Sequence, residues 1–400
     1  MMRFFVAARR RFVRSGAAAV FVPVLVLSGQ ATAFDLETYL EQVRTEYDLP
    51  ALAAAVVRDG ETVAAAAVGT RVYGEDVPVM PDDRFHLGSN AKSMTATLAG
   101  MMVEEGSLDW SSTIGGVLGE DFPGMSESLS AATLEQLLSH SSGIPMDTEE
   151  LVDLYFSADT FDYNPWDRRH RVLDAWKTHE ITVPEGSPFQ YSNLGYMIAG
   201  MMIEKASGEH WETLMNERIF QPLGMETAGL GAQTTFGLVD APVSHRMDED
   251  GNVRPLYWAP AADAPPVLGP AGMAHMSIAD YAKWAVWNLG EGSRGPALVA
   301  PETLKYIHAS KVITPVRENP PPGTPTTGEY AFGWGVVLFD WADHALLTHN
   351  GSNGMNLARI VLDPAEDLGV VVATNFPGRT ADEATGIAME ELYKAYSDGE

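Results

Sequence analysis

The spacing of apolar positions changes along the chain, and each change predicts a different element. Apolar residues at positions 36, 39, 40 and 43 follow the 3.6-residue period of a helix, which predicts an amphipathic helix over 35–48. Two short apolar runs, 52–57 and 62–68, come next and are joined by an Arg-Asp-Gly-Glu turn at 58–61. An Asp-Gly pair between such runs favours a β-hairpin, so we expect a helix followed by two antiparallel strands.

The middle of the chain has mostly helical spacing, whereas the C-terminal part has the spacing of strands. Helices are expected over 89–108, 133–140, 149–157, 194–206, 211–220 and 278–289, the last with Ser277 as its N-cap. After a Pro, Gly and Thr-rich loop at 315–328, strands are expected over 333–339, 345–348, 355–362 and 369–375, and a helix over 381–396. Strands at both ends predict an α/β part, about 34–88 and 270–400, with a helical part inserted at about 89–269.

The first 33 residues have the composition of an export signal. The run Arg-Arg-Arg-Phe-Val-Arg at 9–14 precedes an apolar run over 17–27, and Ala-Thr-Ala at 31–33 has the small residues of a cleavage site. The apolar run is short and contains Pro23, so it predicts a removable signal peptide and no stable membrane span. The arginine order resembles a twin-arginine signal, general secretion is the alternative, and both routes predict a periplasmic or secreted protein.

Composition then narrows the classes of function. The 400-residue chain is 46% hydrophobic, which is enough for a sizeable core, and it carries a net charge of −28. This acidity argues against nucleic acid as a partner, because phosphate binding needs clustered Lys and Arg, and it favours solubility. The absence of cysteine excludes disulfides and thiol catalysis, and the ten histidines lack ligand spacing, so we expect no metal.

The helix expected from residue 89 has candidate chemistry in its first turn. Ser89 follows an apolar run and the permissive Gly88, and Lys92 stands three residues further on. Residues three apart share a helix face, so the Lys92 amine can reach the Ser89 hydroxyl and, if burial lowers its pKa, remove the proton. Because Ser-x-x-Lys is a common pattern, the alternative is a capping serine beside a solvated lysine.

A second candidate is Tyr191, which stands two residues before Asn193 in the loop ahead of the 194–206 helix. A phenol beside a cationic lysine can have its pKa lowered and then pass protons between a nucleophile and a leaving group. The alternative is a half-buried tyrosine at a helix entry.

A third candidate is the segment His-Asn-Gly-Ser at 349–352, which follows the apolar run 345–348. An edge strand ending there could offer a backbone N–H to an oxyanion, with His349 and Asn350 facing the substrate. The alternative is a turn with an incidental histidine, because His-x-Gly also occurs at 86–88.

Together these motifs resemble those of a known family. Ser-x-x-Lys, then Tyr-x-Asn, then Lys-Thr-Gly or His-x-Gly is the motif order of the serine β-lactamase-like hydrolases, in the branch of class C β-lactamases, D-alanyl-D-alanine carboxypeptidases and β-lactamase-fold esterases. Supporting segments lie at 137–145, 184–196, 220–225 and 332–335, and the resemblance covers about 36–395. It implies a β-lactamase/transpeptidase-like α/β fold, with helices flanking an antiparallel sheet and an inserted all-helical domain.

The resemblance also implies the catalytic roles. Ser89 would be the acylated nucleophile, and Lys92 and Tyr191 would share its deprotonation. Tyr191 would then return the proton to the leaving group. No metal or organic cofactor enters this scheme.

The resemblance implies a substrate-binding set as well. Asn193 would orient Lys92 and the substrate amide. The backbone N–H groups of Ser89 and Ser352 would form the oxyanion hole. His349, Asn350 and Gly351 would complete the set at the third motif.

The third motif departs from the β-lactamase pattern. The lysine of Lys-Thr-Gly is a fixed positive charge near the β-lactam carboxylate, whereas His349 would be mostly neutral near pH 7. Members of the family with His-x-Gly include peptidases, D-aminopeptidases and esterases. The resemblance therefore implies an exported, monomeric serine hydrolase that forms a Ser89 acyl-enzyme with a small carboxylester or a D-amino-acid-containing peptide or amide. The enzyme alternatives are a D-alanyl-D-alanine carboxypeptidase and a weak β-lactamase.

An alternative of another class is a catalytically silent, cell-wall-binding relative. Such a protein would be expected to lose Ser89, Lys92 or Tyr191, and all three are present. An α/β-hydrolase is also disfavoured, because the chain contains no Gly-x-Ser-x-Gly.

Overall fold

Strands from both ends of the chain pair in one antiparallel sheet. The computed structural model shows this sheet and describes residues 34–157, 164–257, 262–320 and 323–397, so the expected signal peptide over 1–33 lies outside the described residues. The strands are β1 (Ala51–Arg58), β2 (Glu61–Gly69), β8 (Val312–Ile313), β9 (Glu329–Tyr330), β10 (Gly335–Val337), β11 (Leu346–Ser352), β12 (Leu357–Asp363) and β13 (Leu368–Thr374). Their order is β2-β1-β13-β12-β11-β10-β9-β8, so β1 joins the N-terminal hairpin to the C-terminal strands.

Helices and short strands make up the rest of the described chain. The helices are α1 (Leu36–Glu46), α2 (Ala91–Glu104), α3 (Ile114–Leu118), α4 (Glu127–Ala131), α5 (Leu134–Leu138), α6 (Glu149–Tyr155), α7 (Pro165–Trp176), α8 (Asn193–Ser207), α9 (Trp211–Met215), η2 (Asn216–Phe220), η3 (Pro266–Leu268), α10 (Gly269–Gly272), α11 (Ile278–Leu289), α12 (Pro301–His308) and α13 (Gly378–Tyr396). The short strands are β3 (Phe85–Gly88), β4 (Gly229–Leu230), β5 (Ser244–Met247), β6 (Val253–Leu256) and β7 (Ala274–Met276). Strands β3, β7 and β4 form a second, three-stranded sheet, and β5 pairs with β6.

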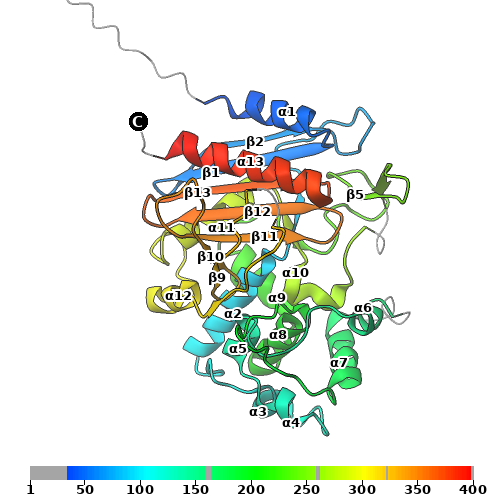
Figure 1. The fold of residues 1–400 in the computed structure, drawn as a ribbon, viewed down its shortest axis with the longest axis vertical. Coiled ribbons are helices and arrows are strands. Elements are labelled where there is room, and N and C mark those ends of the chain that lie inside the picture. Colours follow the sequence, from blue (N-terminus) through cyan, green and yellow to red (C-terminus); the bar gives the residue numbers. More distant parts are fainter. Residues whose placement is uncertain (1–33, 158–163, 258–261, 321–322, 398–400) are drawn as a thin grey trace, which may run out of the picture. The chain divides into compact units, whose positions relative to one another are not determined.

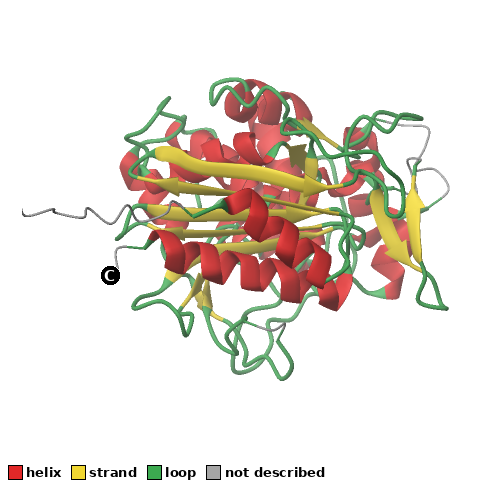
Figure 2. Cartoon of the chain, turned by 90° about the horizontal axis from the view of Figure 1, so that it is seen from above, coloured by secondary structure: helices red, strands yellow, loops and turns green. Residues whose placement is uncertain are grey.

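Both faces of the large sheet are covered by helices. Helices α1 and α13 lie across one face, and α11 packs against the other (Figures 1 and 2). The strand β1 shows the consequence, because Leu52, Ala54 and Val56 join the core under α1 and α13 while its alternate residues join the core on the other face. A strand that is buried on both faces is apolar throughout, which explains its continuous Ala and Val run.

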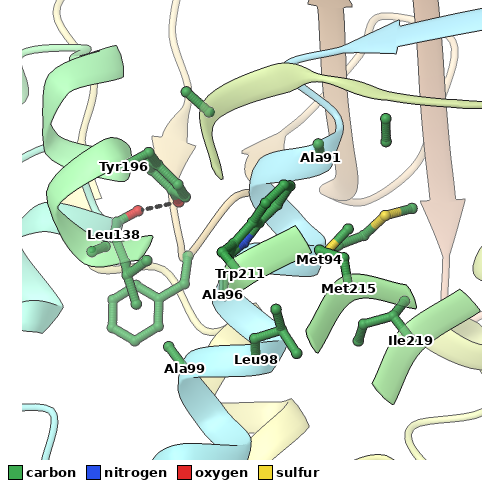
Figure 3. Close-up of a cluster of buried hydrophobic side chains, with 14 of the residues drawn as sticks. Ala91, Met94, Ala96, Leu98, Ala99, Leu138, Tyr196, Trp211, Met215 and Ile219 are labelled. Atoms are coloured by element: carbon green, nitrogen blue, oxygen red, sulfur yellow. Dashed lines mark hydrogen bonds between the residues drawn. The ribbon is translucent and has the colours of Figure 1, made fainter. Parts of the chain in front are cut away.

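The helix α2 lies in the centre of the core on the other face of the large sheet, the face against which α11 packs. Every residue from Ala91 to Met102 is buried, polar ones included, so other elements pack around the whole circumference of the helix. Figure 3 shows Met94 and Leu98 of α2 beside Trp211 and Met215, and the Tyr196 hydroxyl donates to the Leu138 carbonyl, 2.6 Å away, in the same cluster. Since the helix is fixed on all sides, its first turn is held rigidly.

Several local predictions are confirmed. The hairpin turn has Asp59 and Gly60 at φ 51° and 80°, as a turn of type I′ requires. Ser277 caps α11 by accepting from the backbone N–H of Asp280. These features depend on a few neighbouring residues, so the sequence determines them directly.

Other elements were missed or differ from the expectation. The helix α7 was not predicted, because the buried cations Arg168 and Arg169 occupy positions that an amphipathic pattern fills with apolar residues. The part at 89–269 is not all-helical, since β4, β5 and β6 lie within it. Strands of two to four residues contain too little alternation to be recognised from sequence.

Candidate active site

The candidate nucleophile lies in the tight turn between β3 and α2. Ser89 and Asn90 form this turn, and α2 begins at Ala91, so Ser89 directly precedes the helix. Asn90 donates from its side chain to the carbonyls of Leu87, at 2.7 Å, and Ala358 of β12, at 3.1 Å. The turn is thereby tied to the large sheet while Ser89 stays partly exposed.

The end of β11 is pressed against this turn. Gly88 has φ 52°, and a Cβ placed there would lie 2.4 Å from the backbone N of Ser352. A Cβ on Gly351 would lie 1.9 Å from the Leu87 carbonyl oxygen and 2.7 Å from the backbone N of Ser89. Only glycine fits at both positions, and this contact brings the amides of Ser89 and Ser352 close together.

Lys92 joins three segments of the chain through its amine. Its Nζ lies 3.0 Å from Ser89 Oγ, 2.8 Å from Asn193 Oδ1 and 2.7 Å from the Ala271 carbonyl oxygen. The last two atoms can only accept hydrogen bonds, so the two N–H groups of a neutral Lys92 amine donate to them. Its lone pair is then left for the Ser89 hydroxyl, which is the arrangement that a general base needs.

The protonation of Lys92 is set by its surroundings. The side chain is fully buried, and desolvation lowers the pKa of Lys92 to about 7. Asp147 opposes this shift through the attraction of its negative charge, and it also accepts a hydrogen bond from Asn193 Nδ2 at 2.7 Å. Asp147 therefore belongs to the site, although no motif in the sequence pointed to it.

Tyr191 is held over the lysine by His140. The backbone N–H of Gln190 donates to the His140 carbonyl at 2.6 Å, and that of Ser192 donates to His140 Nδ1 at 3.1 Å. The His140 and Tyr191 rings are 4.2 Å apart between centroids, and Lys92 Nζ lies 4.7 Å from the Tyr191 ring centroid. His140 itself has φ 58°, so it holds a left-handed backbone conformation that histidine adopts only occasionally.

The expected lowering of the Tyr191 pKa is wrong. Burial raises the pKa of the Tyr191 phenol well above its ordinary value, and this outweighs a side-chain hydrogen bond with Ser89 that lowers it. The sequence argument assumed a cationic lysine nearby, but burial disfavours the charged form of Lys92 as well. Tyr191 is consequently a proton donor near pH 7 and Lys92 is the better base.

His349 is neutral in the folded protein. Burial and the charges of Lys92 and Arg317 lower the pKa of His349 to about 3 despite its bond to the Asn350 carbonyl. Its Nδ1 lies 2.9 Å from that carbonyl and must donate to it, so Nε2 accepts from the Tyr330 hydroxyl at 2.9 Å. The sequence expectation of a mostly neutral histidine agrees with this arrangement.

The third motif is part of a strand. It was expected to follow a strand ending at residue 348, whereas β11 continues through Ser352 and pairs with β12 over 347–352. It is not an edge strand of the sheet either, because β10 pairs with it over 346–348. Only 349–352 lack a partner on that side, so the available strand edge is this short segment.

Strand geometry separates the two polar residues of the motif. Successive side chains point to opposite faces, so His349 and Asn350 leave β11 in opposite directions. Asn350 pairs with Arg359 of β12, whose guanidinium donates to Asp382 and Thr385 of α13. Both His349 and Asn350 still line one pocket beside the strand edge.

A buried polar network supports the turn from behind. The backbone N–H of Gly88 donates to His86 Nδ1 at 3.0 Å, and His86 Nε2 lies 2.9 Å from Asp263 Oδ1. The same carboxylate oxygen accepts from Asn353 Nδ2 at 2.9 Å, in the turn that follows Ser352. His86 and Asp263 thus connect the segments on both sides of the candidate oxyanion hole, a role that the sequence did not suggest.

The described part of the chain contains no group of three or more His, Asp or Glu side chains that could hold a metal ion. None of its helices is both long and apolar enough to cross a bilayer.

The fold and the site together define a serine hydrolase with a β-lactamase/transpeptidase-like fold. The chain belongs to the beta-lactamase family, whose model matches residues 36–393. This confirms the resemblance and the fold class that the three motifs predicted.

Two relatives show the range of proteins that this chain is similar to. The unguisins hydrolase ungD' of Aspergillus campestris is 27% identical over 362 residues, which are 87% of this chain and 62% of that protein. Penicillin-binding protein 4 of Amycolatopsis lactamdurans is 28% identical over 366 residues, which are 88% of this chain and 90% of that protein. The chain therefore spans about three fifths of the fungal hydrolase and most of the bacterial protein.

Solved structures share the fold. The octameric penicillin-binding protein homologue from Pyrococcus abyssi matches with a TM-score of 0.70 and 24% identity, over 90% of this chain and 77% of that one. The penicillin-binding protein from Bacillus halodurans matches with a TM-score of 0.68 and 22% identity, over 88% of this chain and 99% of that one.

Proposed function

We propose that this enzyme hydrolyses a small carboxylester or a D-amino-acid-containing peptide or amide through an acyl-enzyme on Ser89. One observation carries the proposal: a fully buried lysine whose pKa is lowered to about 7 contacts the Ser89 hydroxyl at 3.0 Å. At this pKa a large fraction of Lys92 is neutral at physiological pH and can accept a proton.

Acylation then follows from the contacts in the site. Ser89 Oγ bonds to the substrate carbonyl carbon as its proton passes to Lys92, and the N–H groups of Ser89 and Ser352 stabilise the oxyanion. The bond to the leaving nitrogen or oxygen breaks as that atom takes the Tyr191 proton. Lys92 then passes the proton that it took from Ser89 to Tyr191, which leaves the acyl-enzyme, a neutral Lys92 and the released amine or alcohol.

Deacylation consumes one water molecule. The water oxygen bonds to the acyl carbon while its proton passes to Lys92, and the bond to Ser89 Oγ breaks. The proton then returns from Lys92 to Ser89 Oγ, so the products are a carboxylic acid and the free enzyme. Asn193 keeps Lys92 in place throughout and has its Nδ2 already committed to Asp147.

A second candidate, strong β-lactamase activity, is disfavoured by the third motif. A neutral His349 offers no fixed positive charge for a β-lactam carboxylate. One panel on purified protein separates the candidates: short-chain p-nitrophenyl esters, a D-alanyl-D-alanine peptide and a chromogenic cephalosporin. Rapid cephalosporin turnover would show that our ranking is wrong.

The nucleophile is tested by covalent labelling. A fluorophosphonate probe should modify the wild type at Ser89, and Ser89→Ala should abolish the labelling. Ser107, near the C-terminal end of α2, gives a matched control, because Ser107→Ala should be labelled like the wild type. Labelling that survives in Ser89→Ala would refute the assignment.

We also propose that residues 1–33 direct export and are removed. Their basic and apolar segments and the Ala-Thr-Ala site support this. N-terminal sequencing of the exported protein should begin at Phe34, and replacing Arg9 and Arg10 by lysine should block export if the twin-arginine route is used. An intact N-terminus on protein retained in the cytoplasm would contradict the proposal.

A further inference from the structure

A buried carboxylate lies behind the candidate oxyanion hole and belongs to none of the three motifs. Asp263 is 6% exposed, and its Oδ1 lies 2.9 Å from His86 Nε2. The same oxygen accepts from Asn353 Nδ2 at 2.9 Å and from the backbone N–H of Ala264 at 2.7 Å. Its Oδ2 is buried and has no hydrogen-bond partner among the described residues. Burial of a half-paired carboxylate costs free energy, so stability alone is a poor explanation for this residue.

The first partner of Asp263 controls the peptide that precedes the nucleophile. His86 is fully buried in β3, and its Nδ1 accepts from the backbone N–H of Gly88 at 3.0 Å. In the neutral ring the proton is therefore on Nε2, which is close to the Asp263 carboxylate but is not aligned with it as in a hydrogen bond. The contact is electrostatic, and it holds the ring that fixes Gly88, the residue directly before Ser89.

The second partner of Asp263 controls the turn after β11. Asn353 follows Ser352, and its Oδ1 accepts from the backbone N–H groups of Met355 at 3.2 Å and Asn356 at 3.0 Å. The Asn353 side chain therefore shapes this turn, while its Nδ2 donates to Asp263. A displacement of Asp263 would be transmitted to the residue next to the Ser352 amide.

The two candidate oxyanion donors come from segments that such a bridge would hold together. Ser89 precedes α2, whereas Ser352 ends β11, whose last four residues pair with β12 but not with β10. The contacts of Asp263 join the two segments from behind. Oxyanion donors must lie about 2.7–3.1 Å from the oxygen that becomes charged, so a small change in their separation weakens the stabilisation.

We propose that Asp263 is a positioning residue, which sets the separation of the Ser89 and Ser352 amides. It acts through His86 and Asn353 and takes no part in making or breaking bonds. The inference rests on the proposed acyl-enzyme mechanism, in which these amides stabilise the oxyanion. Because acylation and deacylation both pass through that oxyanion, loss of the bridge should slow both steps and leave KM nearly unchanged.

The first test is substitution of the carboxylate. Asp263→Ala should lower kcat for p-nitrophenyl acetate, and the rate of fluorophosphonate labelling at Ser89, by about 10- to 100-fold, with KM within about threefold of the wild type. Asp263→Asn keeps an oxygen at the Oδ1 position, which carries all the side-chain contacts described above. It should therefore recover the rate to within about fivefold of the wild type.

A transition-state mimic separates positioning from a loss of folded protein. Phenylboronic acid forms a B–O bond with Ser89 Oγ, whose proton passes to Lys92, and the anionic tetrahedral adduct places one boron-bound oxygen between the two amides. Its inhibition constant should rise about 10- to 100-fold in Asp263→Ala and stay near the wild-type value in Asp263→Asn. An inhibition constant does not depend on the fraction of folded enzyme, so destabilisation alone does not produce this change.

Another buried carboxylate beside a histidine supplies the matched control. Asp363 Oδ1 lies 2.6 Å from His344 Nε2, and its Oδ2 accepts from the Tyr393 hydroxyl. Asp363 lies at the end of β12 opposite the one that pairs with Ser352, roughly 20 Å away along the strand. Asp363→Ala should lower the denaturation midpoint, as Asp263→Ala should, yet keep the wild-type kcat per folded molecule, KM and boronate inhibition constant.

A variant on the more accessible side keeps the test decisive if Asp263→Ala does not fold. Asn353 is only partly buried, and Asn353→Ala removes the second contact of the bridge. It should lower kcat and raise the boronate inhibition constant by about 3- to 10-fold, because one of the two segments is released.

The outcomes separate this inference from the proposed function. If Ser89 is labelled in the wild type but the boronate inhibition constant is unchanged in Asp263→Ala, or in Asn353→Ala where the former does not fold, the bridge is wrong and the mechanism stands. The bridge is also wrong if Asp363→Ala loses as much activity, or if Asp263→Asn is as slow as Asp263→Ala. If the wild type is not labelled at Ser89, the proposed function is wrong. A loss confined to Asp263→Ala and Asn353→Ala supports both.

Discussion

Two buried cations in different regions of the molecule have opposite surroundings. Arg169 of α7 and Lys92 of α2 are both completely shielded from solvent. Arg169 donates to Glu204 and Glu212, and although desolvation lowers its pKa, the hydrogen bonds and charges of these carboxylates outweigh it and raise the pKa. Lys92 has neutral partners in Asn193, Ala271 and Ser89, and its pKa is lowered.

The difference separates a structural charge from a catalytic one. A cation held by two carboxylates stays protonated at all physiological pH values and cannot accept a proton. A cation whose burial is not compensated by a contacting carboxylate gives up its proton near neutral pH, at a cost in folding free energy. The comparison predicts that the two residues respond differently to substitution.

The largest effect is expected on activity at Lys92. Lys92→Met should reduce kcat/KM for a p-nitrophenyl ester by about 10³- to 10⁴-fold, because the general base is lost. The unfolding free energy should change by less than about 2 kcal/mol, since relief of desolvation offsets the lost hydrogen bonds. Kinetics and denaturant unfolding at pH 6 measure both quantities.

The pH dependence of stability provides a control for this variant. The pKa of Lys92 is lowered from 10.5 to about 7 on folding, so the unfolded chain binds the proton more tightly between these values. Wild-type stability relative to Lys92→Met should therefore rise as pH increases from 7 to about 10. A relative stability that stays flat or falls would mean that Lys92 is not buried as an uncompensated amine.

The next effect is expected on stability at Arg169. Arg169→Met leaves Glu204 buried without its cation and should cost about 3–5 kcal/mol of unfolding free energy. The activity per folded molecule should stay within about threefold of the wild type, because α7 contributes no group to the site. Denaturant unfolding combined with active-site titration checks this. If Arg169→Met loses activity but keeps its unfolding free energy, Arg169 is not a purely structural charge.

A smaller effect is expected at the contact between β11 and the nucleophile turn. Gly351→Ala forces a methyl group against the Leu87 carbonyl, so the amides of Ser89 and Ser352 must move apart. Loss of one oxyanion contact costs about 10²- to 10³-fold in kcat, and partial displacement should cost less, about 10- to 100-fold. Gly354→Ala, in the open turn after Ser352, is the matched control, with φ 80° but nothing near its Cβ.

The smallest effect is expected in the pH profile of acylation. The acylation rate should rise with pH and reach half its maximum near pH 7, because Lys92 must lose its proton first. Asp147→Asn removes a charge that raises the pKa of Lys92, so the midpoint should move to lower pH by less than about one unit. Asp174→Asn, at an exposed ion pair with Lys177, should leave the midpoint unchanged, and an upward shift in Asp147→Asn would contradict the assignment.

Much of the fold could be predicted because it depends on near neighbours. The Asp-Gly hairpin, the Ser277 cap and the apolar strands of the C-terminal region follow from patterns within a few residues. The helix α7 could not be predicted, because the partners that make Arg169 a core residue lie 35 and 43 positions away. Its sequence alone is that of a polar segment.

The candidate site divides in the same way. The order of Ser89, Lys92, Tyr191 and His349 could be taken from the sequence, since each motif is a short spacing whose geometry is local. Asp147 carried no such signal, and His140 lay in a supporting segment without an assigned role, because each acts on a residue from a distant segment. The direction of the Tyr191 pKa was wrong for the same reason, since it depends on burial.

The sequence by itself therefore determined which residues can react. It placed a serine three residues before a lysine at the start of a helix, and it supplied the glycines that allow β11 to approach that turn. The tertiary structure alone decided how they react, because the desolvation of Lys92 and Tyr191 and the nearby Asp147 charge arise only when distant segments pack together. The spacing of residues along the chain determines which side chains can contact one another within a motif. The packing of distant segments determines the protonation states of those side chains and the charges around them.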